Sequence, residues 1–124
     1  MKGELFEQKK VLITGGAGFI GSWLCDILVS CGAQVVAVDD FSTGRRINID
    51  HLADNDKFEL IEGDACKFKT ESKFDYIFHL AAHASPDEYQ TKPIETLGAS
   101  SFGTANVAEL ARKSDATLLF ASTS

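Results

Sequence analysis

The chain has 124 residues, of which 44% are hydrophobic and 24% are charged, and its formal net charge is −6. A chain of this length and balance suits one globular domain, and its acidic charge argues against the basic surface that nucleic-acid binding would require. Because it contains no run of about 18 apolar residues and no apolar signal-peptide core near its N-terminus, we expect a cytoplasmic protein without membrane association.

Apolar runs and helical spacing alternate along the sequence. Short apolar runs predict strands at residues 10–14, 34–39, 58–61, 75–80 and 117–121. After the first strand, apolar residues at helical spacing predict a helix over 18–31. The residues that show this spacing are Trp23, Leu24, Ile27, Leu28 and Cys31. A long helix is expected over 93–113 and a short one near 47–52, and the connection between the third and fourth strands leaves room for another.

The cysteines carry no sign of a disulfide framework or a metal site. Cys25, Cys31 and Cys66 show no Cys-x-x-Cys spacing, so we expect reduced thiols that fill the core. No set of His, Cys and carboxylate residues has the spacing of metal ligands, and we predict no metal site.

A glycine-rich loop joins the first predicted strand to the first helix. It contains Gly16-x-Gly18-x-x-Gly21, and also Gly15-x-x-Gly18-x-x-Gly21. One glycine permits a tight turn, another lets the backbone approach a pyrophosphate, and Gly21 lets the helix pack close to the sheet. The helix N-terminus then offers N–H groups to the phosphates. The pattern predicts a dinucleotide-binding loop rather than a P-loop, because no lysine follows Gly21.

An acidic residue stands at the end of the second strand. Asp39 follows Gly21 by 18 residues, and a carboxylate there can accept hydrogen bonds from the adenosine ribose, worth about 1.5–3 kcal/mol each. The same charge would repel a 2′-phosphate, which favours NAD over NADP. Arg45 and Arg46 weaken this preference, since a nearby arginine can accept that phosphate, but Asp40 shifts it back towards NAD.

The strands, helices and glycine loop together indicate the α/β class. Continuous apolar strands that alternate with helices imply a parallel sheet covered on both faces. We predict a Rossmann-type parallel sheet of about five strands with helices on both faces, a three-layer αβα sandwich.

Several short motifs then resemble one known family. They are the glycine loop at 14–21, DDFSTGR at 39–45, Gly63-Asp64, HLAA at 79–82, GTANV at 103–107 and STS at 122–124. Together they resemble the extended short-chain dehydrogenase/reductases, the NAD-dependent nucleotide-sugar epimerases and dehydratases. The sequence ASP at 84–86, together with DDFSTGR at 39–45 and the STS at 122–124, looks most like the UDP-glucuronate decarboxylase branch. Ser-Pro is also an ordinary turn starter.

The loop, the acidic strand end and the resemblance give a set of predicted NAD-binding residues. These are Gly15, Gly18, Phe19, Ile20, Gly21, Asp39, Asp40, Ser42, Thr43, Gly44, Asp64, Ala65, Leu80, Ala81 and Ala82. The resemblance implies that Asp64 contacts the adenine and that residues 80–82 line the cofactor cleft. Turn formation by Gly-Asp and simple packing of the alanines are the structural alternatives.

The resemblance also implies the chemistry of a whole enzyme. In the family a Tyr-x-x-x-Lys motif supplies a general base for a sugar hydroxyl, hydride passes to NAD, and the keto-sugar epimerises, loses water or loses CO2. Thr123, with Ser124 beside it, would hydrogen-bond the same sugar oxygen. Neither Tyr76 nor Tyr89 has a lysine four residues on. We therefore interpret residues 1–124 as an NAD-binding domain that ends before this motif and before the substrate-binding region.

Two functional hypotheses follow. The first is the NAD-binding portion of a nucleotide-sugar epimerase, dehydratase or decarboxylase, which takes a UDP- or dTDP-sugar, is a homodimer at full length and is inactive as this segment alone. The second is a dinucleotide sensor that performs no reaction. His79 is expected to be a hydrogen-bonded core histidine, whereas His83 could reach the cleft.

Overall fold

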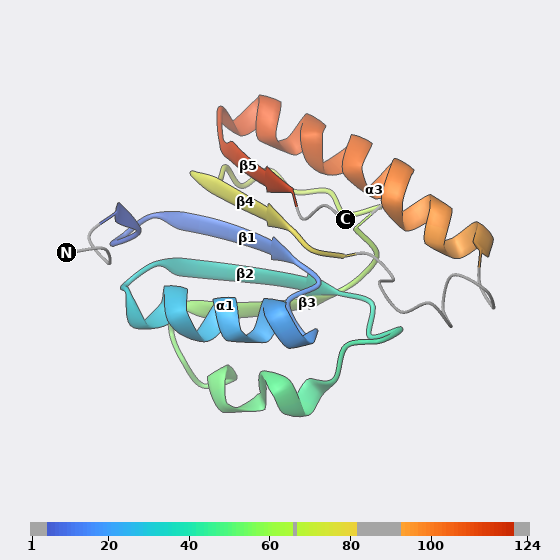
Figure 1. The fold of residues 1–124 in the computed structure, drawn as a ribbon. Helices are drawn as coiled ribbons and strands as arrows, with labels where there is room; N and C mark the ends of the chain where they lie inside the picture. Colours follow the sequence, from blue (N-terminus) through green and yellow to red (C-terminus); the bar gives the residue numbers. More distant parts are fainter. Residues whose placement is uncertain (1–4, 66, 82–92, 121–124) are drawn as a thin grey trace.

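The computed structural model describes residues 5–65, 67–81 and 93–120, and its centre is a five-stranded parallel sheet (Figure 1). The strands are β1 (Lys10–Thr14), β2 (Gln34–Asp39), β3 (Phe58–Glu62), β4 (Tyr76–His79) and β5 (Thr117–Phe120). They lie in the order β3-β2-β1-β4-β5. The chain thus builds the sheet outward from β1 in one direction and then returns to β1 to build the other half.

Helices cover both faces of this sheet. Helix α1 (Phe19–Ser30) lies on one face with the short 3₁₀ helices Arg46–Asn48 and Asp50–Leu52, and helix α3 (Pro93–Ser114) lies on the other (Figure 1). The predicted three-layer αβα architecture is confirmed. The predicted helix near 47–52 is two 3₁₀ turns, and the described residues between β3 and β4 form no helix.

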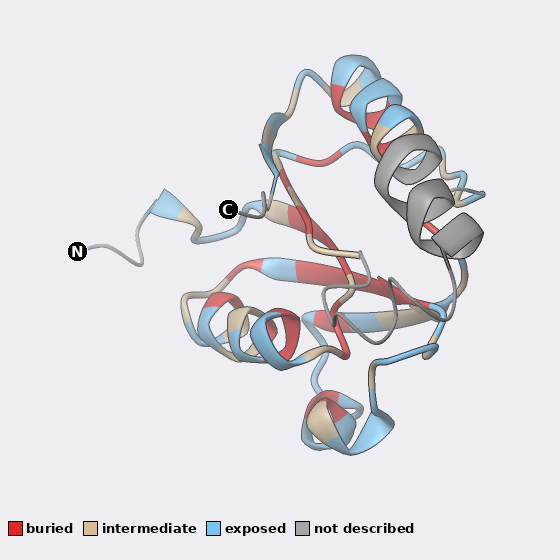
Figure 2. Cartoon of the chain, turned by 45° about the vertical axis from the view of Figure 1, so that its right-hand side comes forward, coloured by how far each residue is buried: buried red, intermediate tan, exposed pale blue. Residues whose placement is uncertain are grey.

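Strand β1 is buried on both faces, which explains its continuous apolar sequence. Val11 and Ile13 face a core that includes Cys25 and Leu28 of α1. Leu12, between them, faces a second core built with Val36, Ile77 and residues of α3. Figure 2 shows this burial concentrated on the central strands.

The buried face of α1 differs from the face that the apolar spacing suggested. Trp23 and Ile27 are 63% and 52% exposed, and the buried residues of the helix are Gly21, Ser22, Cys25 and Leu28. A Cβ on Gly21 would lie 2.1 Å from the carbonyl oxygen of Gly15. This close approach fixes the rotation of the helix, so Cys25 and Leu28, one and two turns after Gly21, point inward, whereas Trp23 and Ile27 do not.

The buried cysteine of α1 is a packing residue. Cys25 is fully buried and unpaired, as expected for a core-filling thiol. Burial raises its pKa to about 12, so the thiol stays protonated at neutral pH. Cys31 is also free and half-buried, and Cys66 lies outside the described residues.

The order of the strands places a topological switch point beside β1. Its neighbours β2 and β4 are followed by connections that leave in opposite directions, and ligands of open α/β sheets bind outside the carboxyl ends of such strands. Across the ranges described above, the structure contains no helix with the length and apolar character needed to span a membrane.

Candidate dinucleotide-binding site

The carboxyl ends of β1, β2 and β4 meet at the glycine loop. The Gly15 N–H donates to the Val38 carbonyl at 2.7 Å, and the Leu80 N–H donates to the Thr14 carbonyl at 3.0 Å. These bonds tie the loop to both neighbouring strands. The predicted residues Gly15, Asp39 and Leu80 are thereby brought to one edge of the sheet.

Three glycines of the loop are required by the protein's own packing. Gly15 has a φ of +76°, and a Cβ there would lie 2.9 Å from the Leu80 carbonyl group. A Cβ on Gly16 would lie 2.5 Å from the Cβ of Ala37, and Gly21 meets the Gly15 carbonyl even more closely. The backbone of the loop therefore sits directly against β2, β4 and the start of α1.

Gly18 is different from these three. Its backbone is extended, with φ −76° and ψ 179°, which any residue can adopt. A Cβ there would meet one neighbouring atom within 4 Å, the Gly15 oxygen at 3.3 Å. The backbone conformation does not demand a glycine at this position, and protein packing constrains it less than Gly15, Gly16 or Gly21. The space beside Gly18 therefore suits a ligand that approaches the backbone.

The first turn of α1 presents backbone N–H groups beside Gly18. Gly18 is the N-cap of the helix, it forms no side-chain capping bond, and the first turn contains no acidic residue. The first N–H groups of an α-helix lack intrahelical acceptors and attract anions. Phe19 and Ile20 are 71% and 70% exposed, so this helix end is open to a phosphate group.

Asp39 is buried and held by backbone donors. Its Oδ2 accepts a hydrogen bond from the Ala17 N–H at 2.9 Å, and its Oδ1 accepts one from the Phe41 N–H at 2.7 Å. Phe41 has a φ of +60°, a strained conformation that this bond helps to hold. A Cβ on Gly44 would lie 2.7 Å from Oδ2. The carboxylate is thus fixed in one orientation, with lone pairs left for further donors.

The turn after Asp39 is exposed and internally bonded. Asp40 Oδ1 accepts hydrogen bonds from the Ser42 N–H at 3.0 Å and the Ser42 hydroxyl at 2.8 Å. Thr43 is exposed. These three predicted residues flank the Asp39 carboxylate on the solvent side.

Of the two arginines that weaken the preference for NAD, Arg45 is exposed, and Arg46 has partners in the structure. Its guanidinium forms an ion pair with Glu62 and lies over the Phe41 ring, 4.3 Å from the ring centroid. Glu62 is the residue of β3 that pairs in register with Asp39. Two carboxylates therefore stand side by side at this end of the sheet, and the neighbouring arginine is engaged with one of them.

A buried polar junction lies beneath the loop at the β1–β4 contact. Thr14 Oγ1 accepts hydrogen bonds from the N–H groups of Leu80 and Ala81 at 3.0 and 3.2 Å, and it lies 2.7 Å from Nδ1 of His79. Because the hydroxyl oxygen already accepts two bonds, its proton points to Nδ1, which places the imidazole proton on Nε2. His79 is 4% exposed, and burial lowers its pKa. The expectation of a hydrogen-bonded core histidine is confirmed.

The loop after β3 carries Asp64 and Ala65. Asp64 is exposed and Ala65 is buried, and the Asp64 carbonyl accepts a hydrogen bond from the Lys67 N–H at 2.9 Å. The side chain of Asn106, from α3, binds the same loop. The sequence motif at 103–107 contained this asparagine but indicated no role for it, because its partners are about 40 residues away.

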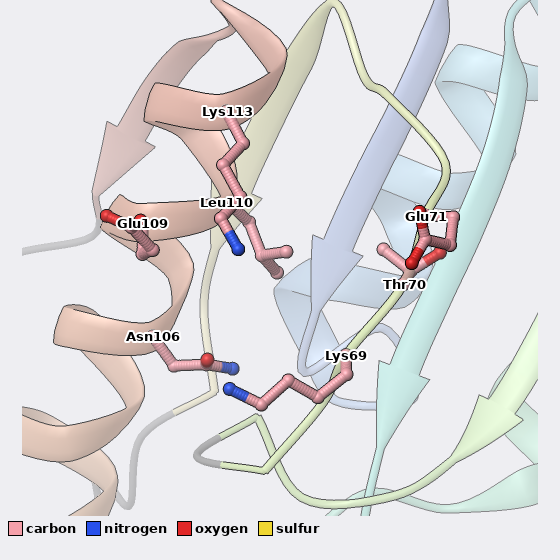
Figure 3. A pocket seen from close by; sticks show the side chains of 7 residues that line it. All are labelled: Lys69, Thr70, Glu71, Asn106, Glu109, Leu110 and Lys113. Atoms are coloured by element: carbon pink, nitrogen blue, oxygen red, sulfur yellow. The ribbon is translucent and has the colours of Figure 1, made fainter.

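One pocket among the described residues has none of the predicted NAD-binding residues in its lining. It has a volume of about 310 Å³ and lies between the loop after β3 and the last turns of α3 (Figure 3). Its lining residues are Lys69, Thr70, Glu71, Asn106, Glu109, Leu110 and Lys113. Asn106 joins this pocket to Ala65 and Phe68 in the first part of the loop after β3.

Some predicted site residues lie outside the described part of the chain. They are Ala82, Thr123 and Ser124. His83 falls in the same category. Within residues 5–65, 67–81 and 93–120, no three His, Cys, Asp or Glu side chains come together as metal ligands could.

Comparisons with known proteins agree with the fold and show the family. Residues 11–124 match the model of the NAD dependent epimerase/dehydratase family. UDP-glucuronic acid decarboxylase 1 is 46% identical in Danio rerio and 42% identical in Arabidopsis thaliana, each over 118 residues and 95% of this chain. An epimerase structure from Methanothermobacter thermautotrophicus superposes with a TM-score of 0.86 at 30% identity, over 98% of this chain and 37% of that one.

The chain spans only part of its relatives. It matches 28% of the length of the Danio decarboxylase and 27% of the Arabidopsis protein. The family resemblance drawn from the short motifs, and the likeness to the decarboxylase branch, are confirmed.

Proposed function

The chain belongs to the NAD-dependent epimerase/dehydratase family, and on this basis we propose that residues 1–124 form the NAD-binding domain of an enzyme acting on a UDP-sugar. The observation that carries the proposal is Gly18. It is the glycine of the loop that protein packing constrains least, and it stands at the uncapped N-terminus of α1. A side chain there would fill the space that a pyrophosphate needs.

The predicted residues fit the parts of NAD in turn. The N–H groups of Phe19, Ile20 and Gly21 would hold the pyrophosphate, with Gly15 shaping the loop around it. Asp39 would accept bonds from the adenosine ribose, flanked by the turn of residues 40–44. When bound, NAD supplies a hydride acceptor for oxidation of the sugar.

The remaining residues would enclose the two ends of the cofactor. Asp64 and Ala65 would meet the adenine, and Leu80, Ala81 and Ala82 would line the cleft beyond β4. Thr123 and Ser124 would approach the sugar hydroxyl. These roles follow from the family resemblance and from the position of each residue in the sequence.

We propose NAD rather than NADP as the cofactor. Asp39 is fixed by two backbone donors, so it cannot swing away from a 2′-phosphate. Glu62 adds a second carboxylate beside it and engages Arg46. The Asp39 charge would repel the two negative charges of a 2′-phosphate at short range, and the ion pair with Glu62 competes with such a phosphate for Arg46.

We propose UDP-glucuronate as the first substrate to test, because the Danio and Arabidopsis relatives are UDP-glucuronic acid decarboxylases. We further propose that a protein of the relatives' length is a cytoplasmic homodimer. Residues 1–124 contain no Tyr-x-x-x-Lys motif, and a general base contributes about 10²–10⁴-fold to such a reaction. We therefore expect the 124-residue chain by itself to bind NAD without turnover.

Two measurements test this function. Titration calorimetry of the 124-residue chain should give saturable NAD binding and weaker NADP binding. An absorbance assay for reduced nicotinamide, with UDP-glucuronate and other UDP-sugars, should give no signal from this chain. NADP binding equal to NAD binding would refute the cofactor assignment. Turnover that disappears in His83→Ala would instead make His83 the base.

A further inference from the structure

Helix α3 binds the first part of the loop after β3 through the side chain of Asn106. Asn106 Nδ2 donates hydrogen bonds to the carbonyl oxygens of Ala65 and Phe68, at 2.7 and 2.8 Å. Nothing in the function proposed above uses this asparagine. Figure 3 shows it extending from α3 towards the loop segment that bears Lys69.

The two bonds define the shape of an otherwise irregular loop. The described residues between β3 and β4 form neither helix nor strand. A turn bond from the Lys67 N–H to the Asp64 carbonyl closes the first part of the loop, and Asn106 captures the Ala65 and Phe68 carbonyls on either side of Lys67. Three carbonyls of residues 64–68 are thereby fixed in direction.

The anchor for this arrangement is rigid. Val107, the next residue of α3, is 1% exposed, and Leu110 and Ala111 are also buried in the core beneath the helix. Phe68 packs against the same core, and Ala65 is 8% exposed. Helix, loop and sheet therefore form one packed unit, in which Asn106 supplies the polar contact.

The side chain is chemically specific for this task. A primary amide nitrogen carries two protons and can serve two carbonyl oxygens at once. A carboxylate of the same shape has no proton at neutral pH and would place negative oxygen against both carbonyls. Asn106→Asp thus replaces two hydrogen bonds to the loop carbonyls with repulsion between oxygens, at nearly constant side-chain volume.

We propose that Asn106 is a positioning residue for the adenine end of the cofactor. By fixing the directions of the Ala65 and Phe68 carbonyls, it orients the Asp64 carboxylate and the Ala65 N–H towards the adenine ring. The inference rests on the proposed function, because it assumes that NAD binds with its adenine at this loop.

The test compares NAD with nicotinamide hypoxanthine dinucleotide by titration calorimetry. The analogue replaces the 6-amino group of adenine with an oxygen, so a loop that accepts a hydrogen bond from that amino group should bind NAD more tightly. The ratio of the two dissociation constants reports on the adenine contacts alone. A general loss of stability would weaken both ligands and leave the ratio unchanged.

We expect wild-type protein to prefer NAD and Asn106→Asp to lose about tenfold in NAD affinity, as for about 1.4 kcal/mol of lost contact. Affinity for the analogue should change much less, so the ratio of the two dissociation constants should fall towards one.

Asn106→Ser retains one hydroxyl donor and should give an intermediate ratio. It replaces the aspartate variant in the test if that variant does not fold. Glu109→Gln is the matched control, because Glu109 lines the same pocket and pairs with Arg112; its ratio should equal that of the wild type.

Equal weakening of both ligands, or no change in either, would overturn the positioning role while NAD binding by the wild type still supports the proposed function. A wild-type protein that binds NAD without discriminating against the analogue would also overturn it. Absence of NAD binding by the wild type would refute the proposed function, and this inference would fail with it.

Discussion

The two ends of the candidate site are built by opposite means. At the phosphate end, Gly15, Gly16 and Gly21 let backbone meet backbone, and the missing side chains create the shape. At the adenine end, one side chain from α3, Asn106, captures loop carbonyls that lie 38 and 41 residues away in sequence. The first end depends on steric exclusion and the second on hydrogen bonds, so substitutions should damage them in different ways.

The largest effect on stability is expected from Gly21→Ala. The new Cβ would meet the Gly15 oxygen at 2.1 Å, and neither backbone segment can move without disturbing α1 or β1. We expect a loss of about 3 kcal/mol, the upper range for overpacking, although alanine normally favours a helix. Urea denaturation followed by circular dichroism measures it. A variant as stable as the wild type would mean that the loop and helix are not in this close contact.

Gly18→Val should separate binding from folding. The valine Cβ meets one protein atom within 4 Å, the Gly15 oxygen at 3.3 Å, and valine is a poorer N-cap than glycine. We therefore expect about 1 kcal/mol of destabilisation, well below the expected cost of Gly21→Ala. NAD affinity should fall at least about 100-fold, because the side chain fills the pyrophosphate space. Calorimetry and urea denaturation on the same sample give both values. Normal NAD binding by the valine variant would place the pyrophosphate elsewhere.

Asp39→Asn should have an intermediate effect and tests the ribose contact. The amide keeps the shape of the carboxylate but has one acceptor oxygen where Asp39 uses two, for Ala17 and Phe41. Loss of charge-assisted bonds should weaken NAD about tenfold. NADP affinity should fall less or rise, since the repulsion is removed. A parallel loss for both cofactors would show that Asp39 shapes the loop without selecting the cofactor.

The smallest effect concerns the pH dependence of stability at the Thr14–His79 junction, which lies beneath the glycine loop. Burial lowers the pKa of His79, so the unfolded chain takes up this proton before the folded chain does. The stabilising contribution of neutral His79 is complete above the unfolded pKa of about 6.5. It is lost as the pH falls below that value towards the folded pKa, by at most about 1.4 kcal/mol per pH unit.

His79→Asn keeps an acceptor for the Thr14 hydroxyl and removes the titratable imidazole. The free energy of unfolding should therefore decrease less between pH 7.5 and 5.5 in this variant than in the wild type. His51→Asn, at an exposed histidine, is the control and should leave the contribution of His79 intact. Identical pH profiles for the wild type and His79→Asn would show that His79 can be protonated in the folded protein at little cost.

The sequence predicted the fold closely because its features are local. The bounds of β1 and β2 agree with the prediction, and β3 and β4 differ by one residue at their ends. Strands of four to six apolar residues between turns are visible without tertiary information. The face of α1 was harder, because Trp23 and Ile27 satisfy helical spacing and yet remain exposed. Their apolar character carried no information about how closely Gly21 approaches Gly15.

In the candidate site, too, the sequence predicted the features that depend on neighbouring residues and not those that depend on tertiary contacts. The glycine pattern and the acid at the end of the second strand were sufficient to predict a dinucleotide loop, since turn geometry and strand ends are set within a few residues. The sequence could not tell Gly18 from its neighbours. That distinction depends on which atoms of β2, β4 and α1 surround each glycine.

The sequence by itself determined the α/β alternation, the glycine loop and the carboxylate at Asp39, because each depends on residues adjacent in the chain. The tertiary structure decided three things: the pairing of Arg46 with Glu62, the Thr14–His79 junction and the hold of Asn106 on the adenine loop. These contacts join residues 16, 65 and 41 positions apart. The strand order and the position of α3 determine which residues meet in these contacts. No pattern of neighbouring residues in the sequence predicts these pairs.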